Sequence, residues 1–533
     1  MKHSMRFLCL LAAGFVASPA IPASVRYIPA WATMTAAFGS TGGFFAKDLV
    51  LDSQGQLIVA GTGSGGGSGG AVVAKLSPTD GSVIWKYTAG PLGSTANAVA
   101  VDASDNVYVA GTVGGSEGYI AKINSSGTPL WTFTTGGGIV GPAGAGFNAI
   151  AVDSTGVVAG GAHGGATPCF FVVKIPVAGA WWDSSDPILG IGAGTLGIIW
   201  TRTWSGVTAV PFDTNQVKRI ALDSSSNVYV ASTDISGPPG YSNRMSKYSS
   251  TNVVAWSLTS WGYNVCGGVG DASMSGGMGR LRVAPDGTLW GVAMNNLHQF
   301  DPATGLVTKS GMFVSSVAGS GPTGLVDFAW WTGGVAVFAS STVVAGRTTW
   351  SSCATGGYSF SSADGWEVSD FSSVQSSNLK AAFVPAAVAL GANGDVFVAG
   401  SSNGAPGGLI VVALRDVLAQ NPVKAGTLEI RNNIINLGDN QTDGQQYAHT
   451  AYIFVRAGTG ATDKNVKVSV FGPSGRFMGQ LTGITIGADG TGSVAFDGVV
   501  EGKRLSTGMY YIVVSGAGVK DRKPIMILGK KDL

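Results

Sequence analysis

Short apolar segments alternate with small polar turns along most of this chain. The recurrent pattern is an apolar strand, an acidic or small residue, a polar turn, and a second apolar strand that ends in small residues. One clear copy reads AVAVDASDNVYVAG, in which Asp102 follows the first strand. Apolar runs of this length between turn residues predict buried β-strands. The other copies place the same marker position at Asp52, Asp153, Asp223, Ala284, Asp327 and Gly391.

Each copy lies in a longer unit with four expected strands. In the second unit we expect strands at 97–101, 107–110 and 119–123, followed by a fourth that contains Trp131. A period close to ~50 residues with four short strands is typical of a β-propeller blade. The sequence therefore predicts a seven-bladed propeller over residues 24–418. Similar Trp-containing fourth strands are expected at Trp85, Trp200, Trp256 and Trp366.

The last unit lacks a fourth strand, because its pattern ends after the segment 409–414. Trp31, in contrast, precedes the first unit and has no unit of its own. We therefore expect the N-terminal segment to form the outer strand of the last blade. Such closure would remove an open sheet edge.

A different pattern follows a predicted linker at 419–426, which contains Asn421 and Pro422. About seven short strands in ~100 residues, with Gly or Asp turns between them, predict an immunoglobulin-like β-sandwich over 427–533. The whole chain is thus expected to be all-β. The candidate strands of this module are 427–431, 450–456, 465–471, 492–496, 508–515 and 524–528.

The N-terminus has the features of a secretory signal peptide, which we assign to residues 1–23. Lys2 and Arg6 precede a short apolar run, and small residues at Ala20 or Ala23 offer cleavage sites. The run is too short to cross a bilayer. We expect a secreted or outer cell-surface protein without a transmembrane segment.

Charge and cysteine content narrow the possible partners. The net charge of +2 argues against a nucleic-acid partner. Three cysteines remain after the signal: Cys169, Cys266 and Cys353. They allow one disulfide with one free thiol, or three thiols, and their spacing fits no metal motif.

The acidic residues suggest structure rather than catalysis. Asp52, Asp102, Asp153 and Asp223 recur at the same position of successive units, which favours turn capping over a single catalytic pair. The segment 439–444 begins like a calcium loop, but Thr450 stands where a bidentate Glu belongs, so we interpret it as a polar loop. No catalytic, cofactor-binding or metal-binding residue is predicted.

One set of residues forms a candidate ligand site. Five residues before each marker, at the start of the innermost strand, lie Lys47, Asn97, Asn148, Lys218, Gly279, Pro322 and Ala386. Arg219 and Arg280 follow two of them. Innermost strands line the channel of a propeller, so a polar rim could bind an anionic or sugar ligand; the alternative is solvated strand ends. The candidate residues are Lys47, Asn97, Asn148, Lys218, Arg219 and Arg280.

Two resemblances add to this interpretation. The units resemble the seven-bladed repeats of secreted bacterial propeller proteins, and VAKLSPTDGSVIWKY (73–87) resembles the repeat of quinoprotein-type propellers. The segments VSVFGPSGR (468–476), FDG (496–498) and STGMY (506–510) resemble the Ig-like domain of flagellar hook-capping proteins and the C-terminal sorting domains of type IX secretion cargo. Phe496 departs from the Trp that is frequent in the hook-capping type. The second resemblance implies a module for sorting or anchoring, with envelope or secretion machinery as its partner.

The expected function is binding or display at the cell surface, with the propeller as scaffold and a surface glycan or protein as ligand. We expect no cofactor and do not favour an enzyme. The alternative is an extracellular propeller enzyme, either carbohydrate-active or a quinone-dependent oxidoreductase. The number of units and the lack of adjacent cysteines argue against the quinone alternative.

Overall fold

A computed structural model shows an almost entirely β protein. Its only described helix is a single 3-10 turn, η1 (Thr35–Phe38). Within the described part of the chain, no helix is long and apolar enough to span a membrane. The structure describes residues 27–38, 44–63, 70–89, 93–114, 117–134, 146–163, 169–179, 200–204, 216–234, 242–258, 262–265, 268–271, 278–293, 296–313, 325–330, 336–340, 343–345, 348–352, 358–362, 365–367, 383–402, 409–416, 424–431, 433–436, 451–463, 465–486 and 490–528.

Most strands form antiparallel four-stranded units, each named here after its first strand. The β2 unit contains β2 (Phe44–Leu51), β3 (Leu57–Gly63), β4 (Ala71–Leu76) and β5 (Val83–Ala89). The next two units are β6 (Thr95–Val101), β7 (Val107–Val113), β8 (Glu117–Ile123) and β9 (Pro129–Thr134), then β10 (Gly146–Asp153), β11 (Gly156–His163), β12 (Cys169–Ile175) and β13 (Trp200–Trp204).

The following units repeat this pairing. They are β14 (Gln216–Leu222), β15 (Val228–Asp234), β16 (Ser242–Tyr248) and β17 (Val254–Leu258); β20 (Met278–Val283), β21 (Leu289–Ala293), β22 (Asn296–Phe300) and β23 (Val307–Phe313); and β24 (Leu325–Trp330), β25 (Ala336–Ser340), β26 (Val343–Ala345) and β29 (Gly365–Glu367). The last comprises β30 (Phe383–Leu390), β31 (Val396–Ser402), β32 (Leu409–Asp416) and β1 (Tyr27–Met34).

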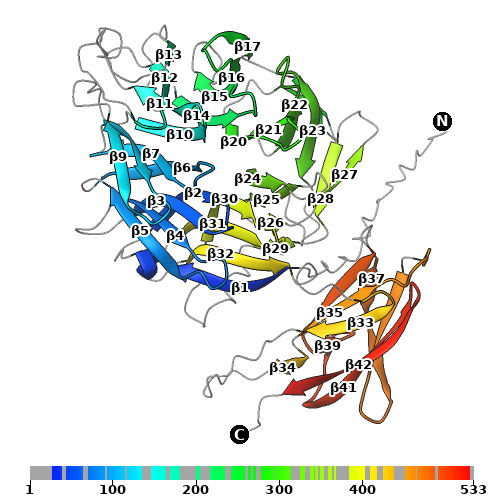
Figure 1. The fold of residues 1–533 in the computed structure, drawn as a ribbon. Helices are drawn as coiled ribbons and strands as arrows, with labels where there is room; N and C mark the ends of the chain where they lie inside the picture. The colour runs from blue at the N-terminus through cyan, green and yellow to red at the C-terminus, as the bar shows by residue number, and fades with distance from the viewer. Residues whose placement is uncertain are drawn as a thin grey trace, which may run out of the picture.

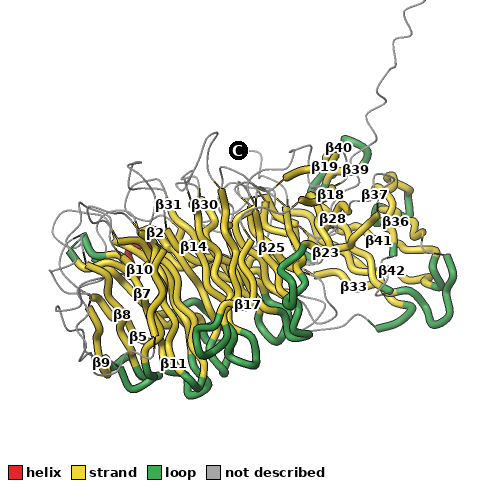
Figure 2. The backbone as a smooth tube through the Cα atoms, turned by 90° about the horizontal axis from the view of Figure 1, so that it is seen from above, coloured by secondary structure: helices red, strands yellow, loops and turns green. Residues whose placement is uncertain are grey.

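The units follow one another around a common centre (Figure 1). Their first strands contact one another in the order β2, β6, β10, β14, β20, β24 and β30, and β30 contacts β2. Figure 2 shows the strands of successive units standing side by side. Apolar side chains fill the space between neighbouring units; Ile58 and Val73 of the β2 unit, for example, share a cluster with Val99 and Val109 of the β6 unit. Strands buried on both faces are apolar throughout, and the expectation of a propeller-like all-β fold is confirmed.

The N-terminal strand completes the last unit, as the sequence predicted. β1 pairs antiparallel with β32, and Trp31 lies opposite Ala413. The Trp31 indole also donates a hydrogen bond to Pro78 O (3.0 Å), in the turn that follows β4. The two ends of the repeat region are therefore joined both within one sheet and between neighbouring units.

That indole contact recurs between other neighbouring units, where a Trp indole binds a backbone carbonyl and packs against a Gly of the same turn. We call it the Trp–Gly latch. The Trp85 indole donates to Ser125 O (3.0 Å), and its ring lies against Gly127 of the same turn. Gly127 has a φ of +90°, which an L-residue adopts only with strain. Equivalent latches join Trp131 to Val177 O and Gly179, Trp256 to Pro302 O and Gly305, and Trp31 to Pro78 O and Gly81.

Two additions to the edge of the β20 unit were not expected. Strand β28 (Tyr358–Ser362) pairs parallel with β23 and antiparallel with β27 (Thr348–Ser352). β18 (Gly262–Val265) pairs with β28 and forms a hairpin with β19 (Gly268–Asp271). Segments from two other parts of the chain thus extend this unit. Their short, Gly- and Ser-rich sequences carry little strand signal.

The C-terminal region has two sheets and a core of its own. The three-stranded sheet is β33 (Thr427–Arg431), β35 (Ala451–Arg456) and β38 (Thr491–Phe496). The five-stranded sheet is β34 (Ile434–Asn436), β42 (Val519–Leu528), β41 (Gly508–Gly516), β36 (Asn465–Phe471) and β37 (Phe477–Thr485). Residues from both sheets share one apolar cluster that includes Ile453, Val468 and Ile512. A small hairpin joins β39 (Val499–Val500) and β40 (Lys503–Arg504).

The candidate strands of this region are largely confirmed, and the bounds 427–431 and 465–471 are those of β33 and β36. β34, β37, β39 and β40 were not expected. Several predictions concern residues outside the described part of the chain: the signal peptide at 1–23, Asn421 and Pro422 of the linker, the loop 439–444, Cys266 and Cys353.

Candidate ligand site at the centre of the ring

The predicted ligand residues occupy equivalent places in successive first strands. In each first strand, the pairing with the second strand shifts by one residue, which marks a β-bulge. The shifted residues include Lys47, Asn97, Asn148, Lys218, Gly279 and Ala386. A bulge interrupts the ladder and redirects side chains, so these residues lie at one level of the inner ring.

The assignment of the β24 unit was wrong. The bulge falls at Val326, between Leu325 and Asp327, and not at Pro322, which lies outside the described residues. Asp327 is therefore not a turn marker; it directly follows the bulge, as Asp48 does in β2. The error arose because this copy of the pattern lacks an acidic turn residue, and the only Asp in it was placed there.

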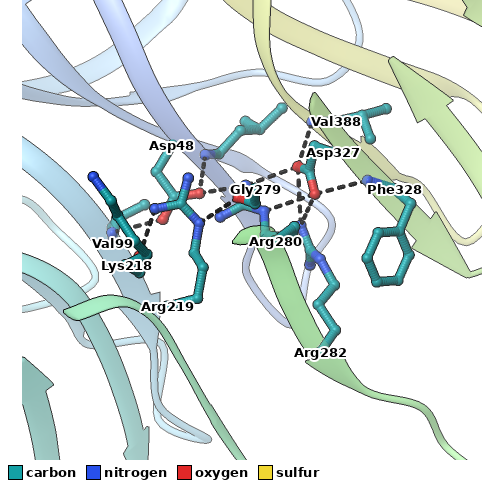
Figure 3. A network of polar contacts seen from close by, with 11 residues as sticks. Asp48, Val99, Lys218, Arg219, Gly279, Arg280, Arg282, Asp327, Phe328 and Val388 are labelled. Carbon is teal, nitrogen blue, oxygen red and sulfur yellow. Dashed lines mark hydrogen bonds and ion pairs between the residues drawn. The ribbon is translucent and has the colours of Figure 1, made fainter. Parts of the chain in front are cut away.

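The residues that follow the bulges form a buried ionic cluster across the ring (Figure 3). Arg280 lies between two carboxylates: its Nε donates to Asp327 Oδ1 (2.6 Å), and its Nη2 approaches Asp48 Oδ1 (2.7 Å). Arg282 Nη2 also lies 3.2 Å from Asp327 Oδ2. Arg280 is only 9% exposed and Asp327 is fully buried. The cluster thus joins the first strands of the β2, β20 and β24 units.

Both carboxylates also bind the backbone of the following unit. Asp48 Oδ2 accepts a hydrogen bond from Val99 N in β6 (3.0 Å), and Asp327 Oδ2 accepts one from Val388 N in β30 (2.8 Å). Their other oxygens accept the N–H groups of Leu49 and Phe328. Each Asp therefore satisfies two backbone donors and an arginine, which compensates for burying its charge.

The arginines set the ionisation of this cluster. Burial opposes the charge of Asp327, but Arg280 and Arg282 hold its pKa at about 2. Burial likewise opposes the charge of Arg280, but Asp327 and Asp48 raise the pKa of Arg280 above its usual value. Asp327 and Arg280 are therefore both ionised at neutral pH.

Two further cations lie beside this cluster in β14. Arg219 donates from Nε to Gly279 O in β20 (2.6 Å) and from Nη1 to Lys218 O (2.7 Å). Burial, together with Arg280, lowers the pKa of Arg219 to about 10. Burial and the neighbouring Arg219 also lower the pKa of the half-buried Lys218. Asp48 and Asp327 attract Arg219 electrostatically, but neither Arg219 nor Lys218 forms a salt bridge with a described carboxylate. Cations thus outnumber carboxylates among the residues described at the centre of the ring.

The other predicted residues differ in their availability to a ligand. Asn97 donates from Nδ2 to Phe147 O (2.9 Å) and approaches Asn148 Oδ1 (3.4 Å), so these two amides join neighbouring units. Lys47 is exposed. Arg280 is committed to Asp48 and Asp327. The structure thus separates a structural cluster from Lys47, which is exposed, and Lys218, which is half-buried.

The interpretation of the recurrent aspartates as turn caps is confirmed. Asp102 Oδ1 accepts hydrogen bonds from Ser104 N and Asn106 N (2.9 Å each), and Asp52, Asp153 and Asp223 make the same type of contact in their own turns. Among the residues that the structure describes, no group of three or more His, Cys, Asp or Glu side chains is arranged to hold a metal ion.

Sequence reasoning missed Asp48, Arg282 and the true position of Asp327. The sequence did contain a signal, because each is a charged residue within a strand of mainly apolar residues. Buried charges require partners, and such residues on neighbouring inner strands are candidates for ion pairs. The pairing itself required the closed ring, since Asp48 and Arg280 are far apart in sequence.

Comparison with known proteins gives structural similarity without a family. No protein-family model matches this chain, and no curated protein matches it. The extracellular domain of a putative hybrid two-component system from B. thetaiotaomicron is 14% identical, with a TM-score of 0.39 over 95% of this chain and 58% of that chain.

Two other solved structures have similarly low scores. Quinohemoprotein alcohol dehydrogenase from Comamonas testosteroni is 11% identical, with a TM-score of 0.33 over 95% of this chain and 63% of that chain. Sqt1 from Chaetomium thermophilum, bound to the N-terminus of ribosomal protein L10, is 10% identical, with a TM-score of 0.37 over 71% of this chain and 88% of that chain.

Proposed function

We propose that this chain is a secreted or cell-surface binding protein whose ring centre accepts an anionic ligand. In this proposal, residues 1–23 are a signal peptide, 24–418 a seven-bladed β-propeller, 419–426 a linker, and 427–533 an Ig-like module for sorting or anchoring. The cyclic contacts of the first strands and the pairing of β1 with β32 support the propeller. The two sheets around a separate apolar core support the sandwich.

The observation that carries the binding function is the excess of cations at the ring centre. Among the residues that the structure describes, four cations (Lys218, Arg219, Arg280 and Arg282) lie near two carboxylates, Asp48 and Asp327. Burial makes an unpaired cation costly, as the lowered pKa of Lys218 indicates. An anion near Lys218 and Arg219 would relieve that cost and gain charge-assisted hydrogen bonds.

The ligand class follows from this geometry. The cations belong to adjacent bulge and post-bulge positions, and the amides of Asn97 and Asn148 lie at the same level of neighbouring strands. Ammonium and guanidinium groups recognise a carboxylate or sulfate group carried on a polar molecule, such as an acidic sugar. We therefore propose an acidic saccharide or a similar small organic anion as the ligand.

The test is calorimetric titration of the full-length protein with galacturonic acid, and with galactose as the neutral probe. We expect galacturonic acid to bind and galactose to bind at least about tenfold more weakly, since a charge-assisted hydrogen bond is worth roughly 1.5–3 kcal/mol. Lys218→Gln should weaken the binding of galacturonic acid by a similar factor. The matched control is Lys424→Gln, which removes an exposed charge outside the ring.

Equal affinities for the two sugars, or equal effects of the two Lys variants, would contradict the anionic-ligand proposal. Conversion of the sugar during the titration would instead favour an enzyme. Both results can be distinguished in one experiment by analysing the recovered ligand.

A further inference from the structure

A second polar and aromatic surface lies on the five-stranded sheet of the C-terminal region. Tyr510, Ile512 and Val514 of β41 face the apolar core, as do Val466, Val468 and Val470 of β36. Because strand side chains alternate between faces, the residues between them lie on the opposite face. That outer face carries rows of side chains, which the strand pairings define.

The first row is aromatic and crosses four strands. Pro524 lies opposite Tyr511, Tyr511 opposite Phe471, and Phe471 opposite Phe477. The rings of Phe471 and Phe477 are 5.5 Å apart between centroids. Phe477 is 52% exposed, and Met509, beside this row, is 42% exposed. We call Tyr511, Phe471 and Phe477 the aromatic row.

The neighbouring rows are polar and basic. Arg522 lies opposite Val513, Val513 opposite Ser469, and Ser469 opposite Gln480. One step further along the strands, Lys520 lies opposite Ser515, and Ser515 opposite Lys467. We call Arg522, Lys520 and Lys467 the basic row; all three are exposed.

The two rows are joined by contact. The Arg522 guanidinium lies over the Tyr511 ring, 5.6 Å from its centroid, and this cation–π contact holds the charge beside the aromatic row. Both partners are therefore held in place before a ligand binds, which lowers the entropic cost of binding. Aromatic residues and Arg are also the types that most often carry binding energy at interfaces.

We propose that this face binds an acidic polysaccharide that lies across the strands. Neighbouring strands are ~4.8 Å apart, which is close to the length of one sugar ring in a chain. Successive members of the aromatic row would then contact the apolar faces of successive sugars. Ser469, Gln480 and Ser515 would contact hydroxyl groups, and the basic row would pair with carboxylates or sulfates.

Charge and polarity favour this occupant over a lipid surface. The middle of the face carries Ser469 and Gln480 beside the aromatic row, and burying such groups in hydrocarbon without partners is costly. A polysaccharide supplies hydroxyl partners for them. This inference concerns a site distinct from the ring centre and does not depend on the anionic ligand proposed there.

The experiment is affinity electrophoresis of the full-length protein through gels that contain polygalacturonate, with dextran as the neutral polymer. We expect retardation by polygalacturonate that declines with salt, and none by dextran. Phe477→Ala and Arg522→Gln should each weaken the apparent affinity by about fivefold or more, in line with the cost of losing one stacking or cation–π contact.

The matched control is Lys503→Gln, because Lys503 is exposed on β40 of the same region and lies outside both rows. It should retain the wild-type affinity for polygalacturonate. If Lys503→Gln lowered the affinity for polygalacturonate as much as Arg522→Gln does, the effect would be one of overall charge, and the proposal would be overturned. Wild-type affinity for polygalacturonate in Phe477→Ala, or binding to vesicles of phosphatidylglycerol but not to polygalacturonate, would also overturn it. The loss of affinity caused by Phe477→Ala should be the same in the wild-type and the Lys218→Gln background, which separates this site from the ring centre.

Discussion

At the residue scale, buried charges in the first strands distinguish this ring from a uniform apolar core. Ala follows the bulge in three first strands, at Ala98, Ala149 and Ala387, whereas charged residues follow it in the others, at Asp48, Arg219, Arg280 and Asp327. Arg280 forms ion pairs with Asp48 and Asp327, and both aspartates accept hydrogen bonds from the backbone of the next unit. Removing one partner would leave the others buried and unpaired, so single substitutions in this cluster should be costly.

We predict that Asp327→Asn destabilises the protein by about 3–5 kcal/mol at pH 7, because Arg280 and Arg282 lose their shared carboxylate. Urea unfolding of the variant and the wild type measures the difference. Asp286→Asn is the control, since Asp286 is exposed in a turn, and it should change stability far less. If Asp327→Asn lowered the free energy of unfolding no more than Asp286→Asn does, the ionic cluster would contribute little to stability.

The stability of the wild type and that of Asp327→Asn should depend differently on pH. Asp327 has a folded pKa of about 2, below its unfolded value of about 3.9. A depressed folded pKa contributes stability that is present above the unfolded value and is lost as pH falls through the folded one. The difference in free energy of unfolding between the wild type and Asp327→Asn should therefore become smaller as the pH falls from 4 to 2. A constant gap in urea unfolding over this range would contradict the assignment.

At the element scale, the Trp–Gly latch joins the outer strand of one unit to a turn of the next. The contact requires Gly for two reasons: the positive φ, and the lack of space for a Cβ against the indole. A Cβ on Gly127 would lie 2.7 Å from Trp85 Cγ. Equivalent contacts recur at Gly81, Gly179 and Gly305, so the latch is a general means of holding neighbouring units together.

We predict that Gly127→Ala costs more stability than Gly55→Ala. Both glycines have positive φ, but a Cβ on Gly55 would meet no atom within 4 Å. Gly55→Ala should cost about 1–2 kcal/mol from backbone strain alone, and Gly127→Ala an additional 1–3 kcal/mol, roughly, from displacing the indole. Denaturant unfolding measures both changes. Equal losses of stability in Gly127→Ala and Gly55→Ala would mean that the Trp85 ring can move aside without lowering stability.

At the scale of the whole molecule, the ring depends on a strand from the far end of the repeat region. β1 covers the edge of β32 and buries Trp31 against Phe397. The C-terminal region, in contrast, has an apolar cluster whose described members all belong to that region. The two parts should therefore respond differently to deletion.

We predict that deletion of residues 24–35, with the signal peptide retained, lowers stability by more than about 3 kcal/mol, because it removes a buried Trp and exposes a strand edge. Thermal unfolding monitored by tryptophan fluorescence tests this. The Trp31→Ala variant keeps the strand and should lose part of that stability. A deletion that unfolds like the parent would contradict closure by β1.

Truncation after Ala419 tests the role of the C-terminal region. A ring with its own closure should remain folded, whereas a protein that lacks its sorting or anchoring module should be released into the medium or mislocalised. Surface labelling of cells that express each form measures retention. Equal retention would remove the anchoring role and leave the region as a structural addition.

The repeat, its strands and its closure could be predicted from the sequence, because these depend on local alternation of apolar residues and turns. The turn-capping aspartates and the outer strand around Trp31 were predictable for the same reason. The edge strands β27 and β28 were not, since β28 pairs with β23 of another unit and that edge lies beside it only in the folded chain. Only the tertiary structure decided the ionic cluster. Asp48, Arg280 and Asp327 come from three units and meet because the ring closes, and a pattern read along one strand contains no information about that meeting.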